Sequence, residues 1–154
     1  MMRAILAAGA ITGALLAAPA AHAGPDGMIM MKSEHDVATT LDHLESALES
    51  KGLTVFERVN HSANAAGVDL DLRPTQVLIF GNPKLGTPLM QANRTVAIDL
   101  PQKALAYEDG EGQVWLAYND PRYLADRHDI SRDHPVVEKI AGALKTFARK
   151  ATGQ

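Results

Sequence analysis

Prolines divide the middle of this chain into short segments. Residues 73–91 read RPTQVLIFGNPKLGTPLMQ, with an apolar run that ends at Gly-Asn-Pro and a second break at Gly-Thr-Pro. Proline has no backbone N–H for a central strand or a helix interior, so an apolar run must end where proline appears. We therefore expect a short buried strand over residues 75–81. A brief helical turn from Pro83 and a second short helix near Pro88 should follow it, because Asn and Thr before Pro suit helix N-termini.

The flanking sequence has both helix and strand patterns. Apolar residues recur at helical spacing from Val37 to Leu48, with Ser33 as the expected N-cap, and again from Pro135 to about Lys150. A short helix is expected to begin at Pro121. Strands are predicted over residues 28–31, 53–61, 75–81, 95–100, 103–108 and 113–119, the last two joined by the turn DGEG. The order predicts an α+β domain in which two main helices cover one face of an antiparallel sheet of about five or six strands, with short helical turns besides.

The N-terminus has the pattern of an export signal. Arg3 precedes an uncharged apolar run, and Ala21-His22-Ala23 supplies the small residues that signal peptidase accepts. We expect a signal peptide over residues 1–23 and a single α+β domain over residues 24–154, located in the periplasm or secreted. A membrane anchor is the alternative, but Pro19 interrupts the run, so no stable membrane span is expected after cleavage.

Composition excludes several classes of function. The chain has no cysteine, which removes disulfides, thiol nucleophiles, thiolate metal sites and covalently attached haem. Its net charge is −3 and the charges are dispersed, so no nucleic-acid partner is expected. FGNPKLG is neither a phosphate loop nor a dinucleotide fingerprint, and the motifs of serine hydrolases and zinc proteases are missing from the sequence. No cofactor is expected.

Several ordered motifs resemble one known family. They are His61, LRPT at 72–75, FGNP at 80–83, GTPLMQ at 86–91, DLP at 99–101 and YNDPRYLADRH at 118–128. Together they resemble the signature of the domain of unknown function 302 family, and the resemblance covers nearly all of the chain after the leader. It implies a small α+β domain of β-α-β4-α type that forms a homodimer. It implies no settled activity.

Polar residues at strand ends and helix starts are the candidates for a ligand-binding cleft, because side chains converge there. Two helix N-termini within six residues, with Arg73 and Lys84 nearby, predict a rim that accepts an anion. The candidate ligand-binding residues are His61, Arg73, Asn82, Thr87, Gln91, Tyr118, Asn119, Arg127 and His128.

Each candidate also has a structural interpretation. Arg73 would be a buried cation paired with Asp71 or Asp99, and Tyr118 a core aromatic residue. Asn82 and Gln91 would be helix caps. His61 would hydrogen-bond the loop that follows it.

The leading hypothesis is an exported binding module for a small, anionic ligand or for a partner protein. The alternative is an enzyme in which His61 or His128 is the general base and Arg73 or backbone N–H groups stabilise an anion. Whether the chain is an enzyme stays open at this point.

Copper handling is a third hypothesis, because thioethers suit Cu(I). It would use Met28, Met30, Met31 and His35, although Met31 on a strand faces away from the other two methionines. His128 and His134 are six residues apart and lack the spacing of a helical metal pair, so no metal site is predicted there.

The leader yields the first prediction. The exported protein should begin at Gly24, because cleavage is expected directly after the Ala21-His22-Ala23 motif. Intact-mass measurement of the protein recovered from outside the cytoplasm checks this. A mass that still includes the first 23 residues would show that the leader is retained.

Overall fold

Helices and strands follow one another in nearly the predicted order. The computed structural model describes residues 22–23 and 27–154, so the expected leader lies outside the described residues except for His22 and Ala23. The elements are β1 (His22–Ala23), β2 (Met28–Lys32), α1 (Val37–Glu49), β3 (Thr54–Asn60), α2 (His61–Ala66), β4 (Thr75–Gly81), α3 (Pro83–Ala92), the 3₁₀ helix η2 (Arg94–Ile98), β5 (Gln102–Glu108), β6 (Val114–Asn119), α4 (Pro121–Arg127) and α5 (Pro135–Thr152).

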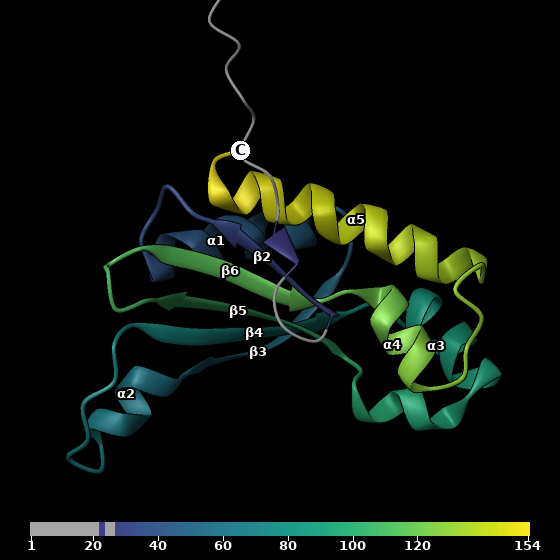
Figure 1. Cartoon of the computed structure of the whole chain (residues 1–154), viewed down its shortest axis with the longest axis horizontal. Coiled ribbons are helices and arrows are strands. Elements are labelled where there is room, and N and C mark those ends of the chain that lie inside the picture. The colour runs from purple at the N-terminus through teal and green to yellow at the C-terminus, as the bar shows by residue number, and fades with distance from the viewer. Residues whose placement is uncertain (1–21, 24–26) are drawn as a thin grey trace, which may run out of the picture.

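The strands form one antiparallel sheet in the order β1-β2-β6-β5-β4-β3. The two long helices, α1 and α5, lie on the same face of this sheet (Figure 1). The shorter helices α3 and α4 gather at one end of the sheet, and α2 projects from the opposite end (Figure 1). This arrangement confirms the predicted α+β fold. Among the described residues, no helix has the length and hydropathy needed to cross a membrane.

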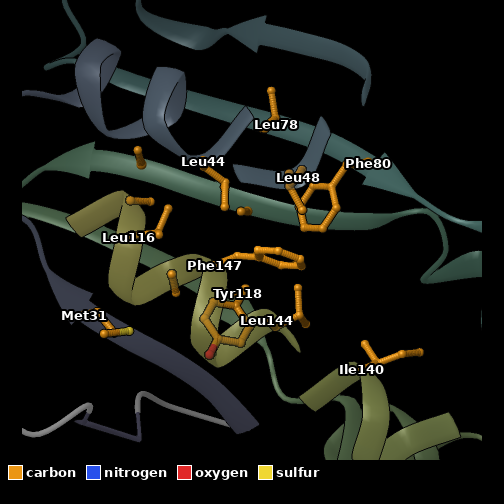
Figure 2. Close-up of a cluster of buried hydrophobic side chains, with 14 of the residues drawn as sticks. Met31, Leu44, Leu48, Leu78, Phe80, Leu116, Tyr118, Ile140, Leu144 and Phe147 are labelled. Atoms are coloured by element: carbon orange, nitrogen blue, oxygen red, sulfur yellow. The ribbon is translucent and has the colours of Figure 1, made fainter. Parts of the chain in front are cut away.

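The core lies between the sheet and the two long helices. Alternate residues of the strands face it, so Leu78 and Phe80 are buried in β4 and Leu116 is buried in β6. Figure 2 shows Phe80 beside Leu48 of α1 and Phe147 of α5, and Leu78 and Leu116 belong to the same buried cluster. Each fully buried side chain of this size contributes about 1.5–3 kcal/mol of transfer free energy.

The first helix begins later than the sequence predicts. Its N-cap is Asp36, not Ser33, and the Asp36 carboxylate accepts the N–H of Thr39 at 2.7 Å. The Ser33 hydroxyl is instead buried against the Thr40 hydroxyl, 2.7 Å away. Asp is as good an N-cap as Ser, and this placement leaves Ser33 free to tie β2 to the helix.

The strand expected over residues 95–100 is wrong: this segment contains η2. The Asn93 side chain caps it by accepting the N–H of Thr95 at 3.0 Å. Val96 is buried while Ile98 is 74% exposed, so the apolar run does not have the alternation of a strand. A local cap and the burial of one side chain outweigh the strand preference of this short run.

The two short helices expected after β4 are one helix, α3. Asn82 caps it and Pro83 is its first residue, as predicted, but Pro88 lies inside it. Proline there removes one backbone hydrogen bond. Burial of Leu89 directly after Pro88 anchors the second half of the helix to the core and holds the turn in place.

A short arm over residues 61–72 projects from the sheet at the end of β3. The sequence treats it as a connection, but α2 begins at His61, and the Asn60 side chain caps that helix by accepting the N–H of Ala63 at 2.9 Å. The remainder of the arm exposes apolar side chains: Val68 and Leu70 are each 65% exposed, and Leu72 is 47% exposed.

The pairing of the edge strand β3 with β4 is irregular. Val55 pairs with Phe80 and Glu57 pairs with Ile79, so one residue, Phe56, is left over between them. An extra residue of this kind bends a strand and turns a side chain out of the regular alternation.

Burial in β4 yields the second prediction. Leu78→Ala should lower the free energy of unfolding by about 2–5 kcal/mol, because the side chain is fully buried and its loss leaves a cavity. Ile79 also fits the sequence expectation of a buried strand, but it lies half-buried on the other face, so Ile79→Ala should cost clearly less. Urea unfolding of the two variants checks this, and equal losses would contradict the assigned faces.

Candidate functional site

The candidate residues fall at two ends of the sheet. β4 runs from Thr75, paired with Tyr107, to Phe80, paired with Gln102. Seven candidates lie at the Gln102 end, near the termini of β4 and β6 and in α3 and α4: Asn82, Thr87, Gln91, Tyr118, Asn119, Arg127 and His128. His61 and Arg73 lie at the other end, about 20 Å away for a strand of seven residues. The structure therefore does not bring all nine together.

A cavity of about 340 Å³ lies at the Gln102 end, between the sheet, α3, η2 and α5. Its walls are mainly apolar, and they include Phe80, Leu85, Met90, Leu100, Leu144 and Phe147. Its rim includes exposed residues such as Phe56 and Thr87, so the cavity opens to solvent. Of the nine candidates, only Asn82 and Thr87 line it.

The first turn of α3 does not offer the anion-accepting rim that the sequence predicts. Pro83 has no N–H, and the N–H of Lys84 donates to the Asn82 side chain at 2.9 Å. The N–H groups of Leu85 and Gly86 both donate to the Asn82 carbonyl at 2.9 Å. Asn82 thus satisfies the donors that would otherwise attract an anion, so its cap role is the one the geometry shows.

Arg73 lies on the surface beside the arm. Its guanidinium donates to the Glu108 carboxylate at 3.0 Å, and its side chain is 56% exposed. Neither Asp71 nor Asp99 is its partner, and it is not buried. The rim that Arg73 was expected to share with Asn82 is not formed, because the two residues lie beyond opposite ends of the same strand.

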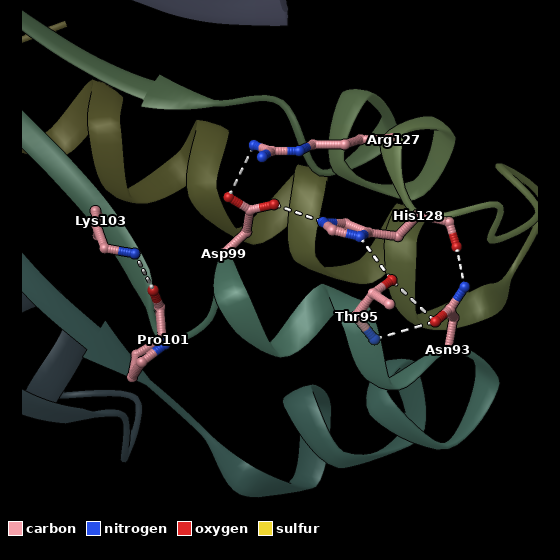
Figure 3. Close-up of polar contacts among 7 residues, drawn as sticks. All are labelled: Asn93, Thr95, Asp99, Pro101, Lys103, Arg127 and His128. Carbon is pink, nitrogen blue, oxygen red and sulfur yellow. Dashed lines mark hydrogen bonds and ion pairs between the residues drawn. The ribbon is translucent and has the colours of Figure 1, made fainter.

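His128 is part of a buried hydrogen-bond network (Figure 3). Its Nε2 lies 2.6 Å from the Asp99 carboxylate and its Nδ1 lies 2.9 Å from the Thr95 hydroxyl. The ring is 6% exposed, and the His128 carbonyl accepts from the Asn93 amide at 2.7 Å. Arg127 adds an ion pair to Asp99 at 3.2 Å. The network joins η2 to the end of α4, and both ring nitrogens of His128 are occupied.

The other candidates lie near the cavity without entering it. Tyr118 belongs to the core (Figure 2), where burial, with a contribution from the charge of Asp120, raises the pKa of Tyr118 to about 12. Its phenol therefore stays neutral at physiological pH. Asn119 is half-buried at the end of β6, and Gln91 is exposed on α3. None of these three residues lines the cavity.

The methionines proposed for copper are divided between the two faces of the sheet. Met31 is 3% exposed and belongs to the core, whereas Met28 and Met30 alternate with it and face the other way. Within residues 22–23 and 27–154, no group of three or more His, Asp or Glu side chains is placed to hold a metal ion.

Gln102 is the site residue that the sequence does not reveal. It begins β5, is 8% exposed and is a polar residue in the lining of the cavity. Glutamine early in a strand, two residues beyond Leu100, carries no signal in sequence. The alternation of β5 would have placed it on the same face as the buried Ala104 and Ala106, but only once the start of the strand was known.

The two environments of Arg73 and His128 yield the third prediction. His128→Ala should lower the free energy of unfolding by about 1–3 kcal/mol, because Asp99 and Thr95 lose a buried partner. Arg73→Gln should change it by less than about 1 kcal/mol, since an exposed ion pair contributes little. Urea unfolding of both variants checks this. A larger loss for Arg73→Gln than for His128→Ala would reverse the assignment.

Known proteins resemble this chain in sequence and in fold. Proteins named fluoride-specific ion channel FluC 1 from Brucella suis biovar 1 (strain 1330) and Brucella abortus biovar 1 (strain 9-941) are each 46% identical over 128 residues, which is 82% of this chain. Those residues cover 50% and 47% of the two proteins, so this chain spans about half the length of each.

The fold has a solved counterpart. The crystal structure of an uncharacterized conserved DUF302 protein from Bacillus stearothermophilus superimposes with a TM-score of 0.73, covering 81% of this chain and 98% of that one at 18% identity. At that identity the likeness establishes the fold alone. The family model "Domain of unknown function DUF302" matches residues 29–147, which is most of the chain. The chain therefore belongs to the DUF302 family.

Proposed function

We propose that this chain is an exported module that binds a small molecule in the cavity between α3, α5 and the end of the sheet. The observation that supports this most is the cavity itself, whose volume of about 340 Å³ lies within the range of small-molecule sites. The expected leader supports export to the periplasm or the cell exterior.

The cavity is a mainly apolar hollow of about 340 Å³ that opens to solvent at the edge of the core. Concave, mostly apolar spaces of this size are typical places for a small molecule to bind. Here the side chains of Phe80 and Phe147 that close the core on one side also form the cavity wall on the other. A space of this size beside the core is consistent with an occupant that completes the packing.

Fluoride is not the ligand that we propose. The FluC name belongs to proteins longer than this chain, and the match covers about half of each. A small anion needs free N–H donors or cations, and the first-turn donors of α3 are taken up by Asn82.

The enzyme alternative has less support from the geometry. His128 has the required neighbours, a carboxylate and a hydroxyl, but the network does not line the cavity. His61 is exposed at the start of α2, at the far end of the sheet. Arg73 also lies at that far end, so it cannot stabilise an anion next to His128.

We also propose that two copies associate as a homodimer. The family resemblance implies this, and exposed apolar side chains on the arm support it. Val68, Leu70 and Leu72 lie within five residues of one another, and such a cluster is costly to leave in water. A second copy that packs against the arm would cover them.

Native mass spectrometry of the freshly purified protein provides the fourth prediction. We expect twice the mass of one chain, with a further increment from a co-purified small molecule that is released on denaturation. The denatured chain supplies the reference mass. The ligand-binding proposal would be contradicted if the complex shows no mass increment and the protein also takes up no apolar probe in solution. A monomer mass would contradict the dimer.

A further inference from the structure

The side-chain amide of Gln102 has no hydrogen-bond partner within the described part of the chain. The residue is 8% exposed. Among the described residues, no fully buried side-chain N or O atom lacks a hydrogen-bond partner. The two amide atoms of Gln102 make no such bond, so neither of them is fully buried and both reach accessible space. Gln102 lines the cavity and also a neighbouring pocket of about 10 Å³ beside Val96 and Leu124, so of these two spaces only the cavity has room for a ligand. The surrounding wall is almost wholly apolar, so a ligand with one hydrogen-bonding group would give this amide the partner that the protein does not supply.

The rest of the cavity excludes charge. None of the lining residues that the structure describes has an ionisable side chain. Its other polar residues are Asn82, which is used as the α3 cap, and Thr87, which is exposed on the rim. A charged group carried into this space would lose its hydration without compensation.

We infer that the ligand is an uncharged, largely apolar molecule with one hydrogen-bonding group that pairs with Gln102. The inference rests on the proposed function, since it names the class of molecule that occupies the same cavity. It replaces the anionic ligand expected from the sequence. An amide both donates and accepts, so a carbonyl, a hydroxyl or a neutral N–H group satisfies it. Met90 on the wall is a flexible side chain that adapts to the shape of an apolar body.

Two dyes with the same aromatic body test the inference. N-phenyl-1-naphthylamine is uncharged and carries one N–H group, whereas 8-anilinonaphthalene-1-sulfonate adds a sulfonate to that body. Fluorescence titration of the full-length protein should show saturable binding of the uncharged dye. The sulfonate should bind at least about tenfold more weakly, because it brings a charge into an apolar space.

Variants locate the bound dye. Gln102→Leu nearly keeps the size of the side chain but removes its amide. It should lower the affinity for the uncharged dye about three- to tenfold, the usual range for one lost hydrogen bond. Ala143→Phe places a ring in the cavity and should lower it at least about tenfold. Gly142→Ala is the matched control on the same helix: it is exposed, with nothing within 4 Å of an added Cβ, and should leave the affinity unchanged. If Ala143→Phe does not fold by circular dichroism, Ala97→Leu fills the cavity from η2 instead.

The outcomes separate the two proposals. If cavity filling weakens binding but Gln102→Leu does not, the role of Gln102 is overturned while the binding function stands. Equal affinity for the sulfonate in the same cavity would overturn the uncharged class. If the uncharged dye does not bind, or binds equally well when the cavity is filled, the cavity is not a binding site and both proposals fail.

Discussion

Burial of one face of the sheet beneath α1 and α5 is the interaction on which the rest of this structure depends. Leu78, Phe80 and Leu116 supply the sheet side, and Leu48 and Phe147 supply the helix side. The helices do not extend equally far over the strands, because α5 continues over α3 and α4 at the Gln102 end. Its residues Ile140 and Leu144 therefore face a space that the sheet does not fill. The cavity follows from the way in which a long helix crosses a short sheet.

Most polar groups near the cavity hold the structure together at the end of the sheet. η2 and α4 must close the end of the sheet, and the network of Asp99, His128 and Thr95 joins them. A histidine between a carboxylate and a hydroxyl resembles catalytic chemistry, but here it joins two short elements that lack an extensive core of their own. Gln102 differs, because it lies in the apolar layer and its amide has no described partner. A polar group without a structural role in such a place is the better indicator of a ligand.

Much of the fold could be predicted because it is encoded locally. β4 was predicted residue for residue, and the hairpin of β5 and β6 follows from its turn and alternation. Where the sequence was misleading, a contact between residues far apart in the chain determined the structure. Asp99 and Thr95 lie 29 and 33 residues from His128, so nothing local showed that this histidine is buried. The faces of β4 are a similar case. Leu78 and Ile79 are both large apolar residues, and only packing against α1 and α5 determines which of them is buried. The cavity takes residues from several elements and was not foreseeable from any one of them.

The unpaired residue in β3 has a consequence for both the edge of the sheet and the cavity. Regular edge strands offer a free row of backbone groups on which another strand can assemble, and a bulge makes that row discontinuous. The same irregularity lets Phe56 reach across to Gly81, where its ring would lie 3.4 Å from an added Cβ, so that it forms the outer wall of the cavity. One extra residue thus interrupts the edge of the sheet, which makes strand addition from another molecule harder. It also places an aromatic side chain at the opening of the cavity. Insertions or deletions in this strand would therefore change the edge of the sheet and the wall of the cavity together.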